Sequence, residues 1–96
     1  MWACAVRIEL RLPGVQSLKE KRAVLRPHLE RLKKLASISV SEVDAHDLWQ
    51  RATMGIGVVA PDRAHLDSIL DRVRRYLDSQ IDIEMIDMAV SYLEKP

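Results

Sequence analysis

The sequence predicts an α+β domain in which two helices cover one face of a four-stranded antiparallel sheet. Some stretches alternate apolar and polar residues, as half-buried strands do. Others repeat apolar residues every three to four positions, as amphipathic helices do. Their order along the chain is β-α-β-β-α-β. A length of 96 residues, with 48% hydrophobic and 30% charged residues, fits one globular domain spanning residues 1–96.

The first strand is expected from Trp2 to Leu12, because every even-numbered residue in this stretch is apolar. The pair Pro13-Gly14 ends it, since proline lacks a ladder donor and glycine frees the turn. A helix then opens at Ser17, whose hydroxyl can accept a hydrogen bond from the backbone N–H of Glu20 in a capping box. The apolar stripe of this helix consists of Leu18, Leu25, Leu29, Leu32 and Ala36.

The second half begins with a short strand over Ile38 to Val43 and a turn over Asp44 to Asp47. A third strand is expected from Leu48 to Ala60, with apolar residues on one face and small or polar residues on the other. Asp62 is a good cap for a second helix. The last strand is expected over Ile81 to Tyr92, with a bulge where the apolar residues change face.

This order is typical of the ferredoxin-like two-layer sandwich, with strand order 4-1-3-2. We expect the first and third strands to be central and parallel. The loops that follow them would then open at the same end of the sheet and bring both helix N-termini together. Ser17, Lys21 and Arg63 would gather there as an anion-binding pocket, because helix N-termini offer free backbone donors.

Charge is unevenly distributed along the chain. The net charge is +1, but residues 1–37 hold nine basic and three acidic residues, whereas residues 38–96 hold six basic and eleven acidic residues. On the first helix Lys19, Arg22, Arg26 and Lys33 fall in one band beside the apolar stripe. Such a row can follow a nucleic-acid backbone, since each contact releases counterions. The alternative is a solvated helix face.

The face of the sheet opposite the helices is expected to be open and smooth. Its central residues are Ala3, Ala5, Thr53, Gly55 and Gly57, with Ile86, Met88 and Val90 alongside. A second copy of the chain could cover such a face, so a homodimer is expected. Base stacking on the central strands is not expected there, because the chain has no Phe and the third strand offers only Trp49, at its start.

No catalytic signature emerges, and no metal or cofactor is expected. His46 with Asp44 and Asp47 fits an ordinary turn, since these side chains satisfy local backbone groups. The single cysteine, Cys4, is expected on the buried face of the first strand with low reactivity. One cysteine excludes an internal disulfide, and the longest uncharged run, ten residues, is half of the ~20 that a membrane helix needs. These features favour the cytoplasm.

Three segments carry a resemblance: SLKEKR at residues 17–22, SVSEV at 39–43 and HDLWQRA at 46–52. Their types and spacing resemble the YlxP-like family of small bacterial proteins, over essentially the whole chain. The resemblance implies a ferredoxin-like fold and a link to translation, since such genes commonly neighbour those of translation and ribosome-maturation factors. The matching residues that could be functional are Ser17, Lys19, Lys21, Arg22, Glu42, Asp47 and Gln50.

Two functions remain. The favoured one is a non-enzymatic RNA- or ribosome-associated protein that docks its first helix on RNA backbone without base readout. The alternative is a homodimeric structural domain, or one that binds a small anion at the helix N-termini. An enzyme ranks third, because no acid–base pair can be defended from the spacing.

Overall fold

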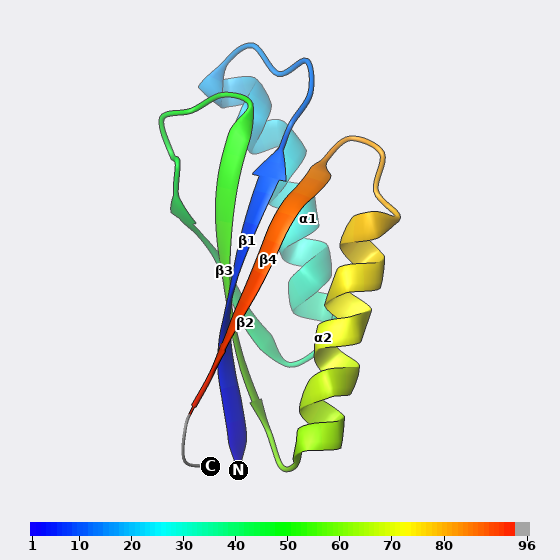
Figure 1. Ribbon diagram of the computed structural model, residues 1–96. Coiled ribbons are helices and arrows are strands. Elements are labelled where there is room, and N and C mark those ends of the chain that lie inside the picture. Colours follow the sequence, from blue (N-terminus) through cyan, green and yellow to red (C-terminus); the bar gives the residue numbers. More distant parts are fainter. Residues whose placement is uncertain (94–96) are drawn as a thin grey trace.

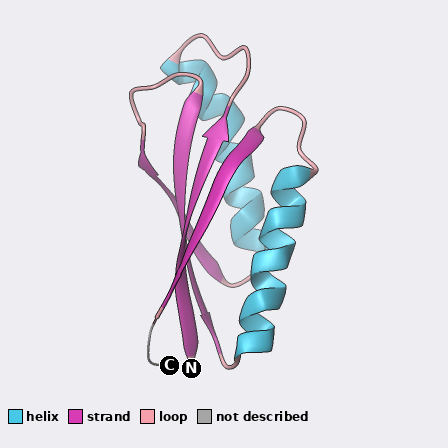
Figure 2. Ribbon diagram, viewed as in Figure 1, coloured by secondary structure: helices cyan, strands magenta, loops and turns pink. Residues whose placement is uncertain are grey.

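The computed structural model describes residues 1–93 as two layers, a twisted sheet and a pair of helices that lie side by side on one of its faces (Figures 1 and 2). The sheet order is β2-β3-β1-β4, which is the expected order 4-1-3-2 read from the other edge. The elements are β1 (Trp2–Arg11), α1 (Leu18–Leu35), β2 (Ile38–Asp44), β3 (Arg51–Ala60), α2 (Arg63–Asp78) and β4 (Glu84–Tyr92).

The expected parallel pairing of the first and third strands is wrong. Strands β1 and β3 are antiparallel, with Trp2 opposite Ala60 and Arg11 opposite Arg51. The reason lies in the connections. Helix α1 returns the chain so that β2 runs in the direction of β1, and the β2–β3 hairpin then reverses it, so β3 must oppose both neighbours. The helix N-termini consequently lie at opposite ends of the sheet (Figure 1).

The core lies between the sheet and the helices, as the alternation predicts. Ile8 and Leu10 of β1, Met54 of β3, Leu32 of α1 and Leu66 of α2 are all fully buried in it. Strand β3 begins at Arg51 rather than at residue 48, and residues 45–50 form its loop to β2. Thus the period-two pattern predicted the buried faces of β1 and β3, while the hydrogen-bonded part of each strand is shorter than the alternating stretch.

The bulge expected in the last strand is present, but it acts differently from the expectation. Leu10 pairs with Met85 and Glu9 with Asp87, so Ile86 is the additional residue. Because of this extra residue, the apolar residues after the bulge lie on the same face of the sheet as Met85 before it. Met88 and Val90 therefore lie on the helix side, opposite the buried residues of β1, and not on the open face. Ile81 precedes the strand and is fully exposed.

The open face owes part of its smoothness to a contact within the chain. At Gly55 a Cβ atom would lie 2.7 Å from Cγ1 of Val43, which folds over the sheet at the irregularity between Glu42 and Asp44. A Cβ atom at Gly57 would make only an ordinary van der Waals contact, 3.8 Å from Cβ of Ser39. Gly55 is therefore explained by packing against Val43, whereas the surface around Gly57 is open.

Candidate nucleic-acid interface

Helix α1 begins with a satisfied cap. Oγ of Ser17 accepts a 3.0 Å hydrogen bond from the backbone N–H of Glu20, as the sequence predicts. The carboxylate of Glu20 accepts in turn from the backbone N–H of Gln16, at 3.1 Å, one residue before the usual capping-box donor. One of the free backbone donors of the first turn, the N–H of Glu20, is thus already used, as is the N–H of Gln16 just before the helix.

The four bases predicted to form a band, Lys19, Arg22, Arg26 and Lys33, are all exposed on α1, and we call them the basic face. The first three line an open hollow of about 540 Å³ on the outer surface of the helix, together with Ala23, Pro27 and Glu30. Within residues 1–93, neither Lys19, Arg22 nor Arg26 forms an ion pair, while Lys33 lies 3.5 Å from Glu30. The helix therefore presents a row of positive charges that its own acids do not neutralise.

The basic face is turned toward the β2 edge of the molecule. Arg22 and Arg26 also line a smaller hollow of about 220 Å³ with Leu25, Leu29 and Glu42 of β2. The two arginines therefore stand on the ridge between two depressions. A polyanion lying along α1 could contact their guanidinium groups from either side.

The arginines of α2 differ from those of α1, because each one contacts a group of the protein itself. Arg63 lies 3.1 Å from Asp67 and Arg75 lies 3.0 Å from Asp71. The other two arginines of this helix donate to Leu35 O and Met88 Sδ. Among residues 1–93, basic residues without an ion-pair partner are therefore more numerous on α1 than on α2, where only Arg72 and Arg74 lack one.

The expected pocket at the two helix N-termini does not form, because those termini lie at opposite ends of the sheet. Ser17 and Lys21 belong to one end. Arg63 belongs to the other, where its guanidinium carbon lies 5.2 Å from the ring centre of Trp2 and 4.5 Å from that of Tyr92. Its pKa is raised chiefly by the hydrogen bond to Asp67. These three residues therefore cannot share one anion.

Lys21 is buried, with 2% of its side chain exposed, and it has the partner that its position on the apolar side requires. Its Nζ donates to Ala45 O at 2.7 Å and lies 2.8 Å from Oε2 of Glu42. Ala45 has a φ of 60°, the left-handed conformation. The ammonium group thus ties the β2–β3 loop to α1 and is not available to an external anion.

Some other residues of the family-like segments also have structural contacts. Nε2 of Gln50 donates to Val15 O at 3.0 Å, and the carbonyl of Gln50 accepts from Leu12 N at 2.9 Å. Asp47 and Trp49 are exposed in the same loop, Trp49 by 52%. Of the seven matching residues, only Lys19, Arg22 and Asp47 have exposed side chains with no described hydrogen bond or ion pair among residues 1–93.

One polar cluster was not predicted from the sequence. His28 is 1% exposed, and its Nδ1 lies 2.8 Å from the hydroxyl of Tyr76 while its Nε2 lies 2.8 Å from Oδ1 of Asp82. The cluster joins α1, the C-terminal end of α2 and the loop before β4. The available signal was the position of His28 on the apolar side of its helix, where a buried imidazole needs partners for both nitrogens.

In the described part of the chain, no three His, Cys, Asp or Glu residues are arranged to hold a metal ion. Neither described helix combines the length and the hydropathy needed to cross a membrane. Cys4 is buried, and burial, followed by the nearby charge of Asp67, raises the pKa of its thiol.

Comparison with known proteins places these features in a family. Residues 4–90 match the family described as "Protein of unknown function (DUF503)". The chain is 43% identical over 68 residues to a protein of Bacillus subtilis (strain 168) described as "Uncharacterized protein YlxP". That alignment covers 71% of this chain and 74% of the relative.

Proposed function

This chain belongs to the DUF503 family, and on that premise we propose that it is a non-enzymatic, cytoplasmic RNA-associated protein that lays the basic face of α1 on RNA backbone. Its RNA partner is proposed to be part of a ribosomal particle. The observation that carries the proposal is the hollow on α1, where Lys19, Arg22 and Arg26 stand exposed and without an ion-pair partner among residues 1–93.

Helical geometry supports contact with a backbone. Lys19, Arg22 and Arg26 follow one another at intervals of about one turn, or ~5 Å of rise, and Lys33 extends the row by two further turns. An exposed basic side chain without an ion-pair partner breaks no contact when it binds phosphate, and each such contact gains free energy from the release of counterions. The pair of Lys33 with Glu30 is weak enough to exchange, since exposed ion pairs contribute only ~0–1 kcal/mol.

The distribution of aromatic residues favours backbone contact over base readout. Recognition of single-stranded bases needs aromatic rings on an accessible surface. Trp49 lies in the β2–β3 loop rather than on the sheet, and Trp2 and Tyr92 pack against each other and Arg63 at the far end of β1. Ala5 and Gly57 occupy the open face where stacking residues would be needed.

The proposal is tested by measuring the affinity for a labelled RNA duplex by fluorescence anisotropy across a series of salt concentrations. Four contacts predict a slope of log affinity against log salt of at most about −3.6, equivalent to roughly a 150-fold loss between 50 and 200 mM salt. Changing Lys19, Arg22 or Arg26 to Ala should each reduce the slope by about one contact and weaken all RNA sequences alike.

The matched control is Arg75→Ala, because Arg75 is an exposed helical base that is already paired with Asp71. It should leave both affinity and slope unchanged. Lys21 is unsuitable as a control, since its ammonium group is part of the fold. Sedimentation with ribosomal particles should likewise be weakened by the three α1 substitutions and unchanged by Arg75→Ala. Equal binding by the wild type and the three α1 variants would refute the proposal.

A further inference from the structure

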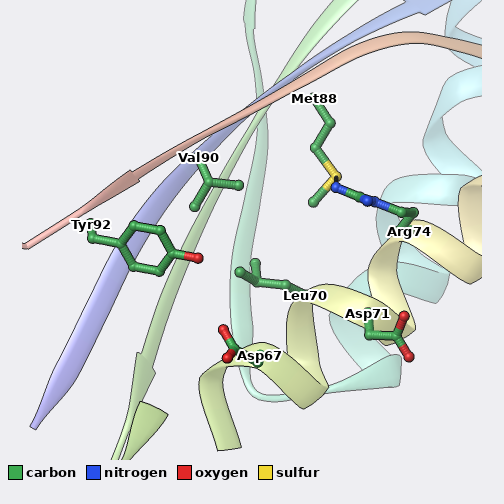
Figure 3. A pocket seen from close by; sticks show the side chains of 7 residues that line it. All are labelled: Asp67, Leu70, Asp71, Arg74, Met88, Val90 and Tyr92. Atoms are coloured by element: carbon green, nitrogen blue, oxygen red, sulfur yellow. Dashed lines mark hydrogen bonds between the residues drawn. The ribbon is translucent and has the colours of Figure 1, made fainter. Parts of the chain in front are cut away.

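A groove separates α2 from the edge strand β4. Its walls are formed by Asp67, Leu70, Asp71 and Arg74 of the helix and by Met88, Val90 and Tyr92 of the strand, and its volume is about 210 Å³ (Figure 3). Leu70 and Val90 face each other across it, with the charged side chains along the helix side. The groove therefore has an apolar floor beside an unpaired strand edge.

The backbone of β4 is oriented to accept another strand. The N–H of Leu93 donates to Ala3 O at 2.9 Å, which makes this pair a hydrogen-bonded pair of the β1–β4 ladder. Alternate residues of an antiparallel pair bond to the same neighbour, so residues 91, 89 and 87 also turn their backbone groups toward β1. The backbone N–H and C=O groups of Met88, Val90 and Tyr92 consequently point away from β1, at the free edge of the sheet.

The two edges of the sheet differ in their protection. The β2 edge is seven residues long and has an irregularity between Glu42 and Asp44, which is a common device against edge pairing. The β4 edge is nine residues long, and Ile86, Tyr92 and Leu93 beside it are 40–47% exposed. The bulge of β4 lies near its start, at Ile86, so the segment from Asp87 to Tyr92 is regular and suited to pairing.

Charge in the groove is arranged in a self-complementary way. Asp67 lies at the Tyr92 end, where Arg63 contacts both residues. Arg74 lies at the opposite end, where its Nη2 is 3.7 Å from Met88 Sδ. A two-fold axis near Val90 would therefore place each Arg74 opposite the carboxylate at the other end of the second copy's groove.

We propose that β4 pairs with β4 of a second copy of this chain, antiparallel and centred on Val90, to form a continuous eight-stranded sheet. Met88 then faces Tyr92 of the partner subunit, and Arg74 faces Asp67 of the partner subunit. The outward backbone groups of Met88, Val90 and Tyr92 are satisfied by their counterparts, and the two apolar grooves close on each other. The basic face of α1 lies on the β2 side and stays uncovered, so this dimer is independent of the proposed RNA contact.

A charge-swap experiment tests this arrangement on the full chain. Sedimentation equilibrium of the wild type should give about twice the chain mass of 11.0 kDa. Arg74→Glu and Asp67→Arg, each alone, place like charges opposite each other twice and should weaken dimerisation at least roughly tenfold. An equimolar mixture of the two variants restores opposite charges at both contacts and should dimerise about as tightly as the wild type.

Two control variants distinguish this interface from others. Arg75→Glu changes an exposed arginine of α2 outside the groove, and Ala5→Arg places a bulky charge on the open sheet face. Neither should change the dimer mass. A monomer at all concentrations up to about 100 µM, roughly a hundred times a Kd of 1 µM, would overturn the proposal. A dimer that Ala5→Arg disrupts while both groove variants preserve it would also overturn the proposal and assign dimerisation to the open face.

Discussion

Replacing Lys21 by Met should destabilise the fold strongly, although lysine is normally a surface residue. Methionine keeps the apolar stem of the side chain and removes its ammonium group. Two groups then lose their partner: Ala45 O, which accepts a hydrogen bond at 2.7 Å, and the buried Oε2 of Glu42, which forms an ion pair at 2.8 Å. The Glu42 side chain is 20% exposed, too little for water to replace the lost contact fully.

The expected cost follows from this geometry. Breaking a buried ion pair by removing one partner costs ~3–5 kcal/mol, and we expect about 3 kcal/mol because Glu42 is not fully buried. For a domain of this size that lowers Tm by roughly 12–24 °C. Urea denaturation followed by circular dichroism gives the free energy of unfolding. Lys19→Met, two residues earlier and exposed, is the matched control and should change it by no more than ~0.5 kcal/mol.

A second substitution separates the charge from the packing. Adding Glu42→Gln to Lys21→Met removes the uncompensated carboxylate and should recover part of the lost stability. The reasoning is refuted if Lys21→Met costs less than ~1 kcal/mol, or if the second substitution lowers stability by as much as it does in the wild type, since an interacting pair cannot be additive.

Three further predictions concern single groups. Tyr76→Phe removes the hydroxyl beside Nδ1 of His28 and should cost ~1–3 kcal/mol in urea denaturation, because a buried nitrogen loses its partner. Cys4 should react with a thiol reagent far more slowly in the folded chain than in urea, because burial raises its pKa and blocks access; equal rates would contradict this. The pKa of Asp44 is lowered by the N–H of the next residue and by Arg7, so its contribution to stability is fully present above the unfolded pKa of ~3.9 and is lost as the pH falls through the lower folded pKa. Asp44→Asn should therefore be less stable than the wild type at pH 6, and the difference should shrink at pH 3.

Local patterns were sufficient for much of this protein. The alternation in β1 predicted which face of the strand is buried, from Cys4 to Leu10, and the S-x-x-E pattern predicted the cap at Ser17. The order of helices and strands, combined with right-handed crossovers, predicted the sheet order. The strand face and the cap depend on neighbours in the chain, and the sheet order follows from the order of the elements and the handedness of their crossovers, so the sequence by itself determines them. The same holds for the exposure of the basic face, since helical periodicity places it beside the apolar stripe.

Contacts between distant residues were decided only by the tertiary structure. Helical periodicity showed that Lys21 needs a partner, but only the path of the chain brings Glu42 and Ala45 to it. His28 gave no sign of Tyr76, 48 residues away. The bulge at Ile86 decided the face of Met88 and Val90, because one extra residue reverses every side chain beyond it. Strand direction decided the rest: since β1 and β3 are antiparallel, the two helix N-termini are separated by the length of the sheet, and no anion pocket can join them.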